Sequence, residues 1–330
     1  MKIVILDRNT LGDDTPLCEI ERHGELICYA STTPDQVIER IAGADVVIVN
    51  KVKMPREVIS STDTLKLICV FATGYDNIDV TAARECGVGV CNVPGYSSDS
   101  VAMYTVSAVL ALATHIIEHN EFVRSGEYTL SGMANRLTPV FHEIRGNVWG
   151  VVGYGGIGRA VADIARAMGA EVVVCKQTED SSIRCVDIDT LCKISDIITL
   201  HVPLTEKTQG LINADRIGKM KENVILVNEA RGKVVDEEAV ANAVLSGRIA
   251  GFGCDVYSKE PFDFTHPYDS IKHLKNVLLT PHAAWAAYEA RARCAEIIGK
   301  NIDSYKMGEF LNRVDILRQN QPLSTVITQK

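Results

Sequence analysis

The stretch Val148-Trp-Gly-Val-Val-Gly-Tyr-Gly-Gly-Ile-Gly158 decides the fold of this chain. It is an apolar run that ends in the pattern Gly-x-Gly-x-x-Gly, and residues 159–169 continue with apolar side chains at helical spacing. A second apolar run, residues 171–175, follows directly. The pattern predicts a strand, a tight turn, a helix and a second strand, which is the context that a dinucleotide-binding fingerprint requires.

Each glycine of the pattern has a physical role. Gly153 permits the tight turn, Gly155 lets a pyrophosphate approach the backbone, and Gly158 lets the helix pack closely on the sheet. The N–H groups of the first helical turn then point at the phosphates. A short loop before a helix can carry three glycines for packing alone, but the flanking strands favour a dinucleotide site.

Length and charge limit the remaining possibilities. At 330 residues the chain exceeds a typical single core, so two domains are expected. The hydrophobic content of 46% and the charged content of 23% are ordinary for a globular protein. The net charge of −8, without a cluster of Lys and Arg, argues against nucleic acid or an anionic membrane surface as a partner.

The ten cysteines indicate a reducing compartment. None forms a C-x-x-C pair, and most lie inside apolar runs where a thiol behaves as a small hydrophobe, so neither disulfides nor a metal site is expected. The chain begins with a strand pattern, residues 1–7, and no signal peptide, which predicts the cytoplasm. The apolar segment Val101 to Ile117 contains too many polar side chains for a membrane span and is interpreted as a buried helix.

Short apolar runs alternate with helical patterns along the whole chain, which predicts an α/β fold with parallel sheets. The turn-rich segment 92–100 marks a crossing between domains, and a helical pattern at 287–305 follows the last strand and returns to the first domain. We therefore expect two doubly wound domains: a discontinuous, flavodoxin-like substrate domain of residues 1–98 and 281–330, and a Rossmann dinucleotide-binding domain of residues 99–280.

Three polar residues follow predicted strands of the second domain, where ligands of parallel sheets collect. They are Arg231, Glu260 and His282. A guanidinium can bind a carboxylate and polarise a carbonyl, an imidazole can exchange the alcohol proton, and a carboxylate can orient the imidazolium. Taken singly, each residue is as compatible with a surface charge or a packing role as with a catalytic role. Together they suit hydride transfer to a 2-oxo acid.

From Leu65 to Trp285 the chain resembles the D-isomer-specific 2-hydroxyacid dehydrogenases. The motifs that carry the resemblance occur in the family's order: Ala72-Thr-Gly-Tyr-Asp-Asn-Ile-Asp79, Asn92-Val-Pro-Gly-Tyr-Ser97, the glycine fingerprint, His201-Val-Pro-Leu-Thr205, Val227-Asn-Glu-Ala-Arg-Gly232, Asp255-Val-Tyr-Ser-Lys-Glu-Pro261 and Thr280-Pro-His-Ala-Ala-Trp285.

The resemblance implies a role for individual residues. Arg231 would bind substrate, Glu260 would partner the histidine, His282 would be the acid/base, and the backbone at Thr73-Gly74 would hold the substrate carboxylate across the domain cleft. The residues implied at an NAD(H) or NADP(H) cofactor are Gly153, Gly155, Gly156, Ile157, Gly158 and Arg159 around the pyrophosphate, Pro203 and Ala230 along the nucleotide, and Asp255 at the nicotinamide amide. The family also implies a homodimer through the helix that begins near Val101.

Two departures from the family pattern matter. Many relatives carry Glu-His or Gln-His where this chain has Met103-Tyr104, so the roles of those polar side chains do not transfer. The acidic residue that normally binds the ribose hydroxyls falls at Lys176, which offers charge to a 2′-phosphate. Lys176 therefore predicts dual cofactor use with some lean to NADP(H), unless its side chain points to water.

The sequence favours an oxidoreductase that interconverts a small 2-oxo acid and its D-2-hydroxy acid. A nicotinamide-sensing binding protein of the corepressor kind, on the same fold, is the alternative, because fold alone does not decide function. A formate dehydrogenase is less favoured, because that branch is expected to carry Gln at the position of Glu260. A phosphoglycerate dehydrogenase is also less favoured, because that branch often has a regulatory extension, which is not expected here. The segment Pro281 to Trp285 resembles hydroxypyruvate and glyoxylate reductases, which gives a weak lean toward those substrates.

Overall fold

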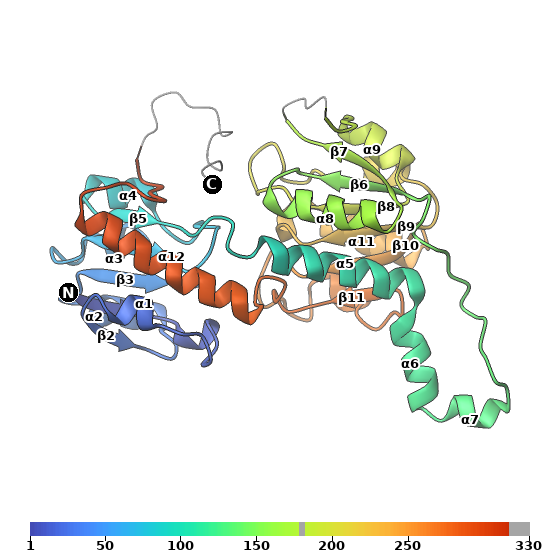
Figure 1. Ribbon diagram of the computed structural model, residues 1–330, viewed down its shortest axis with the longest axis horizontal. Helices are drawn as coiled ribbons and strands as arrows, with labels where there is room; N and C mark the ends of the chain where they lie inside the picture. The colour runs from blue at the N-terminus through green and yellow to red at the C-terminus, as the bar shows by residue number, and fades with distance from the viewer. Residues whose placement is uncertain (178–181, 317–330) are drawn as a thin grey trace. The chain divides into compact units, whose positions relative to one another are not determined.

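The computed structural model describes residues 1–177 and 182–316 of the chain and divides into two compact units (Figure 1). Unit 1 consists of Met1–Ser97 with Ala287–Lys330, and unit 2 of Ser98–Ala286. The return to unit 1 comes after Ala286, later than the expected boundary between residues 280 and 281. His282, expected in the substrate domain, therefore lies in unit 2 with the rest of its loop.

Unit 1 is built on a parallel sheet with the strand order β2-β1-β3-β4-β5. Its strands are β1 (Lys2–Ile5), β2 (Glu25–Cys28), β3 (Val46–Val49), β4 (Leu67–Val70) and β5 (Gly89–Cys91). This is the flavodoxin-like order predicted for the substrate domain. Strands β3 and β4 are buried at every position, as the unbroken apolar runs predict for strands covered on both faces.

Short helices cover one face of this sheet, and one short and one long helix cover the other. The first face packs α2 (Val37–Ile41), α3 (Arg56–Ile59) and α4 (Val80–Glu85) around buried valines and isoleucines of the strands. The other face carries α1 (Cys18–Glu21) and α12 (Tyr288–Lys306), which contact each other. The predicted helix at 287–305 is thus present, and it packs on the first unit as expected.

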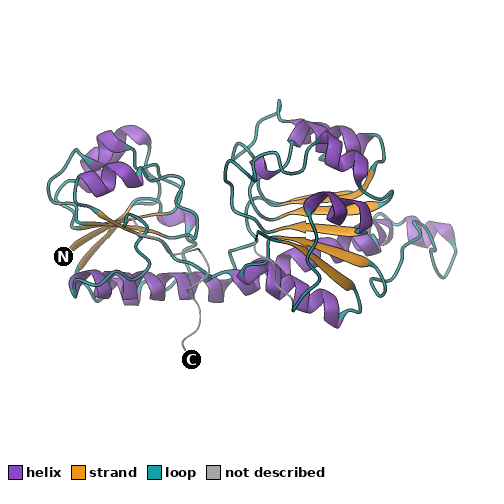
Figure 2. Ribbon diagram, turned by 90° about the horizontal axis from the view of Figure 1, so that it is seen from above, coloured by secondary structure: helices purple, strands orange, loops and turns teal. Residues whose placement is uncertain are grey.

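Unit 2 is built on a six-stranded parallel sheet with the order β11-β10-β9-β8-β6-β7, and helices cover both of its faces (Figure 2). The strands are β6 (Val148–Val152), β7 (Glu171–Cys175), β8 (Ile197–Leu200), β9 (Val224–Asn228), β10 (Ile249–Cys254) and β11 (Val277–Leu279). The chain order reverses at β6, whose neighbours are β7 and β8. In a doubly wound sheet the crevice for a ligand opens at such a reversal.

The two faces of the second sheet have separate cores. One core joins α5 (Ser98–Thr114) and α8 (Gly156–Ala167) around the buried Trp149. The other joins α9 (Ile188–Ile194), α10 (Ala214–Lys219) and α11 (Glu237–Leu245) around Phe252 and Tyr268. Because both faces are buried, the strands carry few polar side chains, and chemistry is confined to the loops at their ends.

The single helix expected from Val101 to Ile117 is wrong in its extent. Helix α5 begins earlier, at Ser98, and ends at Thr114, because His115 has a left-handed backbone with a φ of 52°. The chain continues as α6 (Ile116–Arg124) and α7 (Glu127–Ser131), which project away from the sheet of unit 2 (Figure 1). Among the described residues no single helix is long and apolar enough to cross a membrane; α5 and α6 meet that length and composition only as a pair bent by 63°.

Candidate active site

Arg231, Glu260 and His282 all lie after neighbouring strands of the second sheet. Arg231 follows β9, Glu260 stands in the loop after β10, and His282 follows β11. Parallel strands bring their carboxyl ends to one edge of the sheet, so three segments far apart in the sequence meet at that edge. The structure thus brings the sequence-predicted trio to one side of unit 2.

Glu260 and His282 form a direct pair. Nδ1 of His282 lies 2.7 Å from Oε2 of Glu260, and the other carboxylate oxygen accepts a hydrogen bond from the backbone N–H of Tyr257 at 3.1 Å. The His282 side chain is 25% exposed and that of Glu260 is 31% exposed, so the pair can be reached from solvent. A carboxylate fixed on one ring nitrogen orients the imidazole and stabilises its protonated form.

Asp255 holds the loop that carries His282. Its Oδ1 accepts hydrogen bonds from Thr280 Oγ1 at 2.6 Å and from the backbone N–H of Ala283 at 2.8 Å, and its Oδ2 accepts from the N–H of Ala284 at 2.9 Å. The Asp255 side chain is almost fully buried. His282 has a φ of 53°, an unusual conformation for a residue with a side chain, and these bonds on both sides of it keep the backbone there.

The turn that presents Arg231 is built by Asn228. The buried Asn228 amide donates to the carbonyl of Arg231 at 3.0 Å, and its side-chain oxygen accepts from the N–H of Ala230 at 3.1 Å. A Cβ on Gly232 would lie 2.0 Å from the carbonyl carbon of Tyr257, so only glycine lets the Arg231 turn pack on the loop that carries Glu260. The motif from Val227 to Gly232 therefore packs against the neighbouring loop and also supplies the Arg231 side chain.

The glycine fingerprint forms the close turn that was predicted. A Cβ on Gly158 would lie 2.0 Å from the carbonyl oxygen of Gly153, so the helix can approach β6 only with glycine at this position. A Cβ on Gly155, in contrast, would meet no heavy atom within 4 Å. Gly155 precedes the first residue of α8, Gly156, which leaves the N-terminal N–H groups of that helix approachable. The open space beside Gly155 forms a cradle that fits a pyrophosphate, and the Ser98 hydroxyl lies next to Gly156 at the same helix end.

Two cations lie over the ring of Tyr154 in the same turn. The Arg159 guanidinium carbon is 5.1 Å from the ring centroid, and Lys176 Nζ is 5.7 Å from it. Lys176 comes directly after β7, the strand that ends next to the glycine turn. Arg184, a second basic residue of the same region, forms an ion pair with Glu171. Lys176 and Arg159 are thus brought together around one aromatic ring beside the cradle.

His201, in the motif that contains Pro203, is half-buried, and both of its ring nitrogens are sealed from solvent. Burial lowers the pKa of His201 to about 3, and both ring nitrogens lack a hydrogen-bond partner among the described residues. A histidine that stays neutral throughout the physiological range does not serve as an acid. Pro203 is exposed, and Ala230 is nearly buried at the end of β9.

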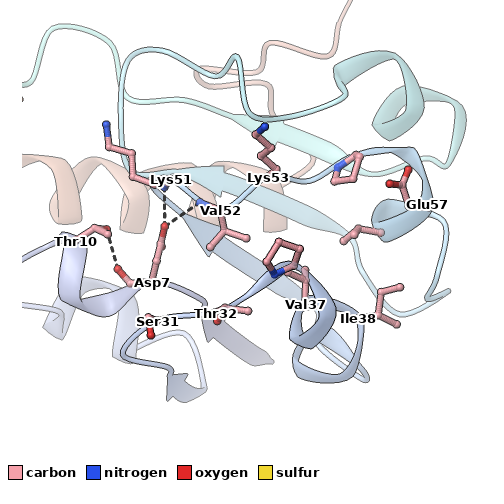
Figure 3. Close-up of a pocket in the computed structure, with 13 residues that line it drawn as sticks. Asp7, Thr10, Ser31, Thr32, Val37, Ile38, Lys51, Val52, Lys53 and Glu57 are labelled. Atoms are coloured by element: carbon pink, nitrogen blue, oxygen red, sulfur yellow. Dashed lines mark hydrogen bonds between the residues drawn. The ribbon is translucent and has the colours of Figure 1, made fainter. Parts of the chain in front are cut away.

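Thr73 and Gly74, the remaining predicted substrate residues, belong to unit 1. Thr73 donates from Oγ1 to the carbonyl of Val93 at 2.8 Å and accepts at its own carbonyl from Asn92 Nδ2 at 2.7 Å. Elsewhere in unit 1 a cavity of about 600 Å³ lies beside Asp7 and Lys51 (Figure 3). None of the sequence-predicted site residues lines that cavity.

Sequence reasoning did not find the residues that support this site. Ser100 Oγ donates to the carbonyl of Ala284 at 2.6 Å, which fixes the His282 loop to α5. Glu237, at the start of α11, accepts from the backbone N–H of Ser258 at 2.8 Å and lies 3.0 Å from Nε2 of His266, which anchors the loop of Glu260. No spacing in the sequence marks these contacts, because each joins distant segments.

A dinucleotide cradle with an arginine, a glutamate and a histidine at the neighbouring strand ends defines a nicotinamide-dependent oxidoreductase. The family model described as D-isomer specific 2-hydroxyacid dehydrogenase, NAD binding domain, matches residues 106–284. A hydroxypyruvate reductase of Blautia hydrogenotrophica is 36% identical over 324 residues, which cover 96% of this chain and 100% of that protein. A glycerate dehydrogenase of Methylorubrum extorquens is 36% identical over 319 residues, covering 95% and 99%.

Similarity to solved structures agrees with these matches. The structure of an acyclic imino acid reductase in complex with NADPH and D-Arg has a TM-score of 0.83 and 29% identity, and the match covers 95% of this chain and 100% of that one. The chain belongs to the D-isomer-specific 2-hydroxyacid dehydrogenase family. It is an NAD(P)-dependent enzyme that interconverts a 2-oxo acid and its D-2-hydroxy acid. The alternative of a nicotinamide-sensing binding protein is not favoured.

Proposed function

We propose that this enzyme reduces hydroxypyruvate or glyoxylate to the corresponding 2-hydroxy acid, with Arg231, Glu260 and His282 as its catalytic residues. The observation that carries the assignment of residues is the 2.7 Å contact between Glu260 and the ring of His282, beside the turn of Arg231. The names of the relatives support the choice of substrate, since they include a hydroxypyruvate reductase and a glycerate dehydrogenase.

The three side chains divide the work by their chemistry. Arg231 presents a planar fork of N–H donors that grips the substrate carboxylate and polarises its 2-oxo group. The contact with Glu260 uses Nδ1 of His282, so the proton that the new alkoxide takes up leaves from Nε2. Glu260 stabilises the imidazolium before that transfer. When bound, the reduced nicotinamide supplies the hydride that reaches the carbonyl carbon.

Other residues have proposed roles at the two ligands. Gly153, Gly155, Gly156, Ile157, Gly158 and Arg159 hold the pyrophosphate, with Pro203 and Ala230 along the nucleotide and Asp255 toward the nicotinamide amide. The backbone at Thr73 and Gly74 takes the substrate carboxylate. The family resemblance supports these roles, and the open space at Gly155 supports the pyrophosphate site.

We also propose that NADPH is accepted alongside NADH. Lys176 follows β7, where an acidic residue would repel a 2′-phosphate, and both Lys176 and Arg159 contact the ring of Tyr154. Two cations at one place favour a phosphate more than one does. A solved relative in complex with NADPH supports this choice.

A homodimer in the cytoplasm is the proposed state of the enzyme. Exposed apolar side chains lie on α6 and α7, which come directly after the helix expected to begin near Val101. Ile116 is 60% exposed, Val123 56% and Leu130 86%. Such a row of exposed apolar residues is typical of an interface. The ten cysteines are all free thiols, which fits a reducing compartment.

A panel of 2-oxo acids, each measured with NADH and with NADPH, tests the proposed function. We expect the highest kcat/KM for hydroxypyruvate or glyoxylate and a D configuration in chiral products. A higher kcat/KM for a bulky or branched 2-oxo acid would contradict the substrate assignment. Binding of the cofactor without turnover of any 2-oxo acid would contradict the catalytic assignment.

A further inference from the structure

Glu229 is a buried acid that the proposed mechanism does not use. It stands in the motif between Asn228 and Arg231, directly after β9, and its exposed fraction is 9%. Its Oε2 is sealed from solvent and has no hydrogen-bond partner among the residues that the structure describes. A buried carboxylate oxygen without a partner is unfavourable, so Glu229 requires a physical explanation.

The surroundings of Glu229 favour its neutral form. The titratable groups whose charges reach it belong to the end of β10 and the loop that follows: Asp255, the Cys254 thiol and the Tyr257 hydroxyl. None of them is a cation. Desolvation by burial, followed by the charge of Asp255, raises the pKa of Glu229 to about 9. The neighbouring Asp255 already accepts three hydrogen bonds, so a second negative charge beside it is disfavoured.

The topology of the sheet places Glu229 on the path of the cofactor. The pyrophosphate cradle lies after β6, and the reacting groups follow β9, β10 and β11, in the sheet order β11-β10-β9-β8-β6. A dinucleotide that spans from the cradle to His282 must bring its nicotinamide over the ends of β9 and β10. Glu229 and Asp255 are the residues that follow those two strands.

We propose that Glu229 is a cofactor-binding residue that acts as a neutral carboxylic acid and donates its O–H to the carboxamide oxygen of the nicotinamide. This inference rests on the proposed function, since it assumes that the nicotinamide lies at this edge. A neutral acid offers the donor that a carbonyl oxygen requires, whereas an ionised carboxylate would only accept. In active sites, two carboxyl groups often stand in different surroundings, so that one is protonated while the other is ionised.

The first test measures cofactor binding without turnover. NADH fluorescence titrations at pH 7 to 10 should show a wild-type Kd that increases above about pH 9, where Glu229 loses its donor proton. Glu229→Gln, whose amide keeps a donor, should bind NADH at pH 7 within about threefold of wild type and lose this pH dependence. Glu229→Ala should bind about 2- to 12-fold more weakly at pH 7, the value of one neutral hydrogen bond.

Two controls isolate the nicotinamide end. ADP-ribose lacks nicotinamide, so its Kd should be the same in wild type and in Glu229→Ala and should not change above pH 9. Glu238→Gln replaces an exposed glutamate of α11 in the same unit and should keep the wild-type profile with NADH. If ADP-ribose shows the same loss as NADH, Glu229 acts on the whole unit and the proposal is overturned.

A second measurement checks the neutral state directly. The folded protein keeps the Glu229 proton up to about pH 9, whereas an unfolded chain releases it near the ordinary value of 4.5, so stability falls as pH rises across this window. The urea midpoint of the cofactor-free wild type should therefore fall, relative to that of Glu229→Gln, between pH 5 and about pH 9. Parallel curves would mean that Glu229 is ionised, which overturns the proposal.

The outcomes separate this inference from the proposed function. A wild-type protein that binds NADH, with Kd values unaffected by either substitution, overturns the role of Glu229 and leaves the enzyme assignment intact. A pH effect on stability alone, without an effect on NADH binding, identifies Glu229 as a structural acid and also overturns the proposal. A protein that binds neither NADH nor NADPH overturns both.

Discussion

Among the residues of unit 2 that the structure describes, two glutamate–histidine pairs differ in their surroundings. In the Glu260–His282 pair the side chains are 31% and 25% exposed, and the pair lies at the ends of β10 and β11. In the Glu237–His266 pair they are 10% and 6% exposed, with a separation of 3.0 Å. The ring of His266 stacks among aromatic residues, with its centroid 4.9 Å from that of Phe262.

The hydrogen bonds of the two pairs explain what each can do. Nδ1 of His266 accepts from the backbone N–H of Tyr268 at 3.2 Å, so the ring donates from Nε2 to Glu237 and both nitrogens are used by protein. Glu237 also binds Ser258. The Glu237–His266 pair is buried and fixes a loop, whereas the Glu260–His282 pair is accessible to solvent. A glutamate–histidine pair can thus stabilise a loop when it is buried, and it can act as an acid/base when one ring nitrogen is accessible to a ligand.

The largest expected effect comes from removing each histidine in turn. His282→Ala should lower kcat by about 10² to 10⁴, the usual contribution of a general acid, while the Kd for NADH stays near that of wild type. His266→Ala should keep most of kcat but lower the free energy of unfolding by about 1 to 3 kcal/mol, because it leaves buried partners unpaired. Stopped-flow kinetics and urea unfolding measure the two quantities. Equal losses of kcat in both variants would remove the distinction between the pairs.

Arg231→Lys sharpens the assignment of substrate binding. The change keeps the charge but removes the planar fork, so kcat/KM for 2-oxo acids should fall about 10- to 100-fold, the value of a charge-assisted hydrogen bond. Lys233→Arg, an exposed neighbour in the same loop, serves as the control and should leave kcat/KM unchanged. An unaltered kcat/KM in Arg231→Lys would show that Arg231 is a surface residue.

The two glutamates should differ in which quantity their substitution changes. Glu260→Gln removes the charge that stabilises the imidazolium, so kcat for reduction should be about 10-fold lower near neutral pH, with a urea midpoint close to that of wild type. Glu237→Gln should lower the urea midpoint and keep most of kcat. A loss of kcat in Glu237→Gln, with none in Glu260→Gln, would reverse the two assignments.

The smallest expected effect concerns cofactor choice. Lys176 contributes a partly exposed charge, so Lys176→Asp should change the ratio of kcat/KM for NADPH over NADH by about 1.4- to 5-fold, toward NADH, the range of an exposed ion pair. Lys193→Asp, an exposed lysine on α9, is the matched control and should leave this ratio as in wild type. The lysine has no part in selection if both variants give the wild-type ratio.

The sequence by itself determined the fold class and predicted the three residues that we propose as catalytic. Glycines at 153, 155 and 158 between two apolar runs predict a strand-turn-helix-strand unit, in which Gly153 has a φ of 93°, Gly158 packs on the carbonyl of Gly153 and the space beside Gly155 stays open. Continuous apolar runs specify parallel strands covered on both faces. The order of the motifs along the chain was enough to predict that Arg231, Glu260 and His282 each follow a strand.

Only the tertiary structure decided how those residues are held. Asp255 fixes the backbone on both sides of His282, and Glu237 anchors the loop of Glu260, through contacts that join segments about 20 residues or more apart. The break of the long helix at His115 and the enclosure of Glu229 were equally invisible in the sequence. Periodicity reports which face of a strand or helix is apolar, but the neighbours of a polar side chain depend on how distant loops pack together. The burial that raises the pKa of Glu229 exists only after β9 and β10 lie side by side.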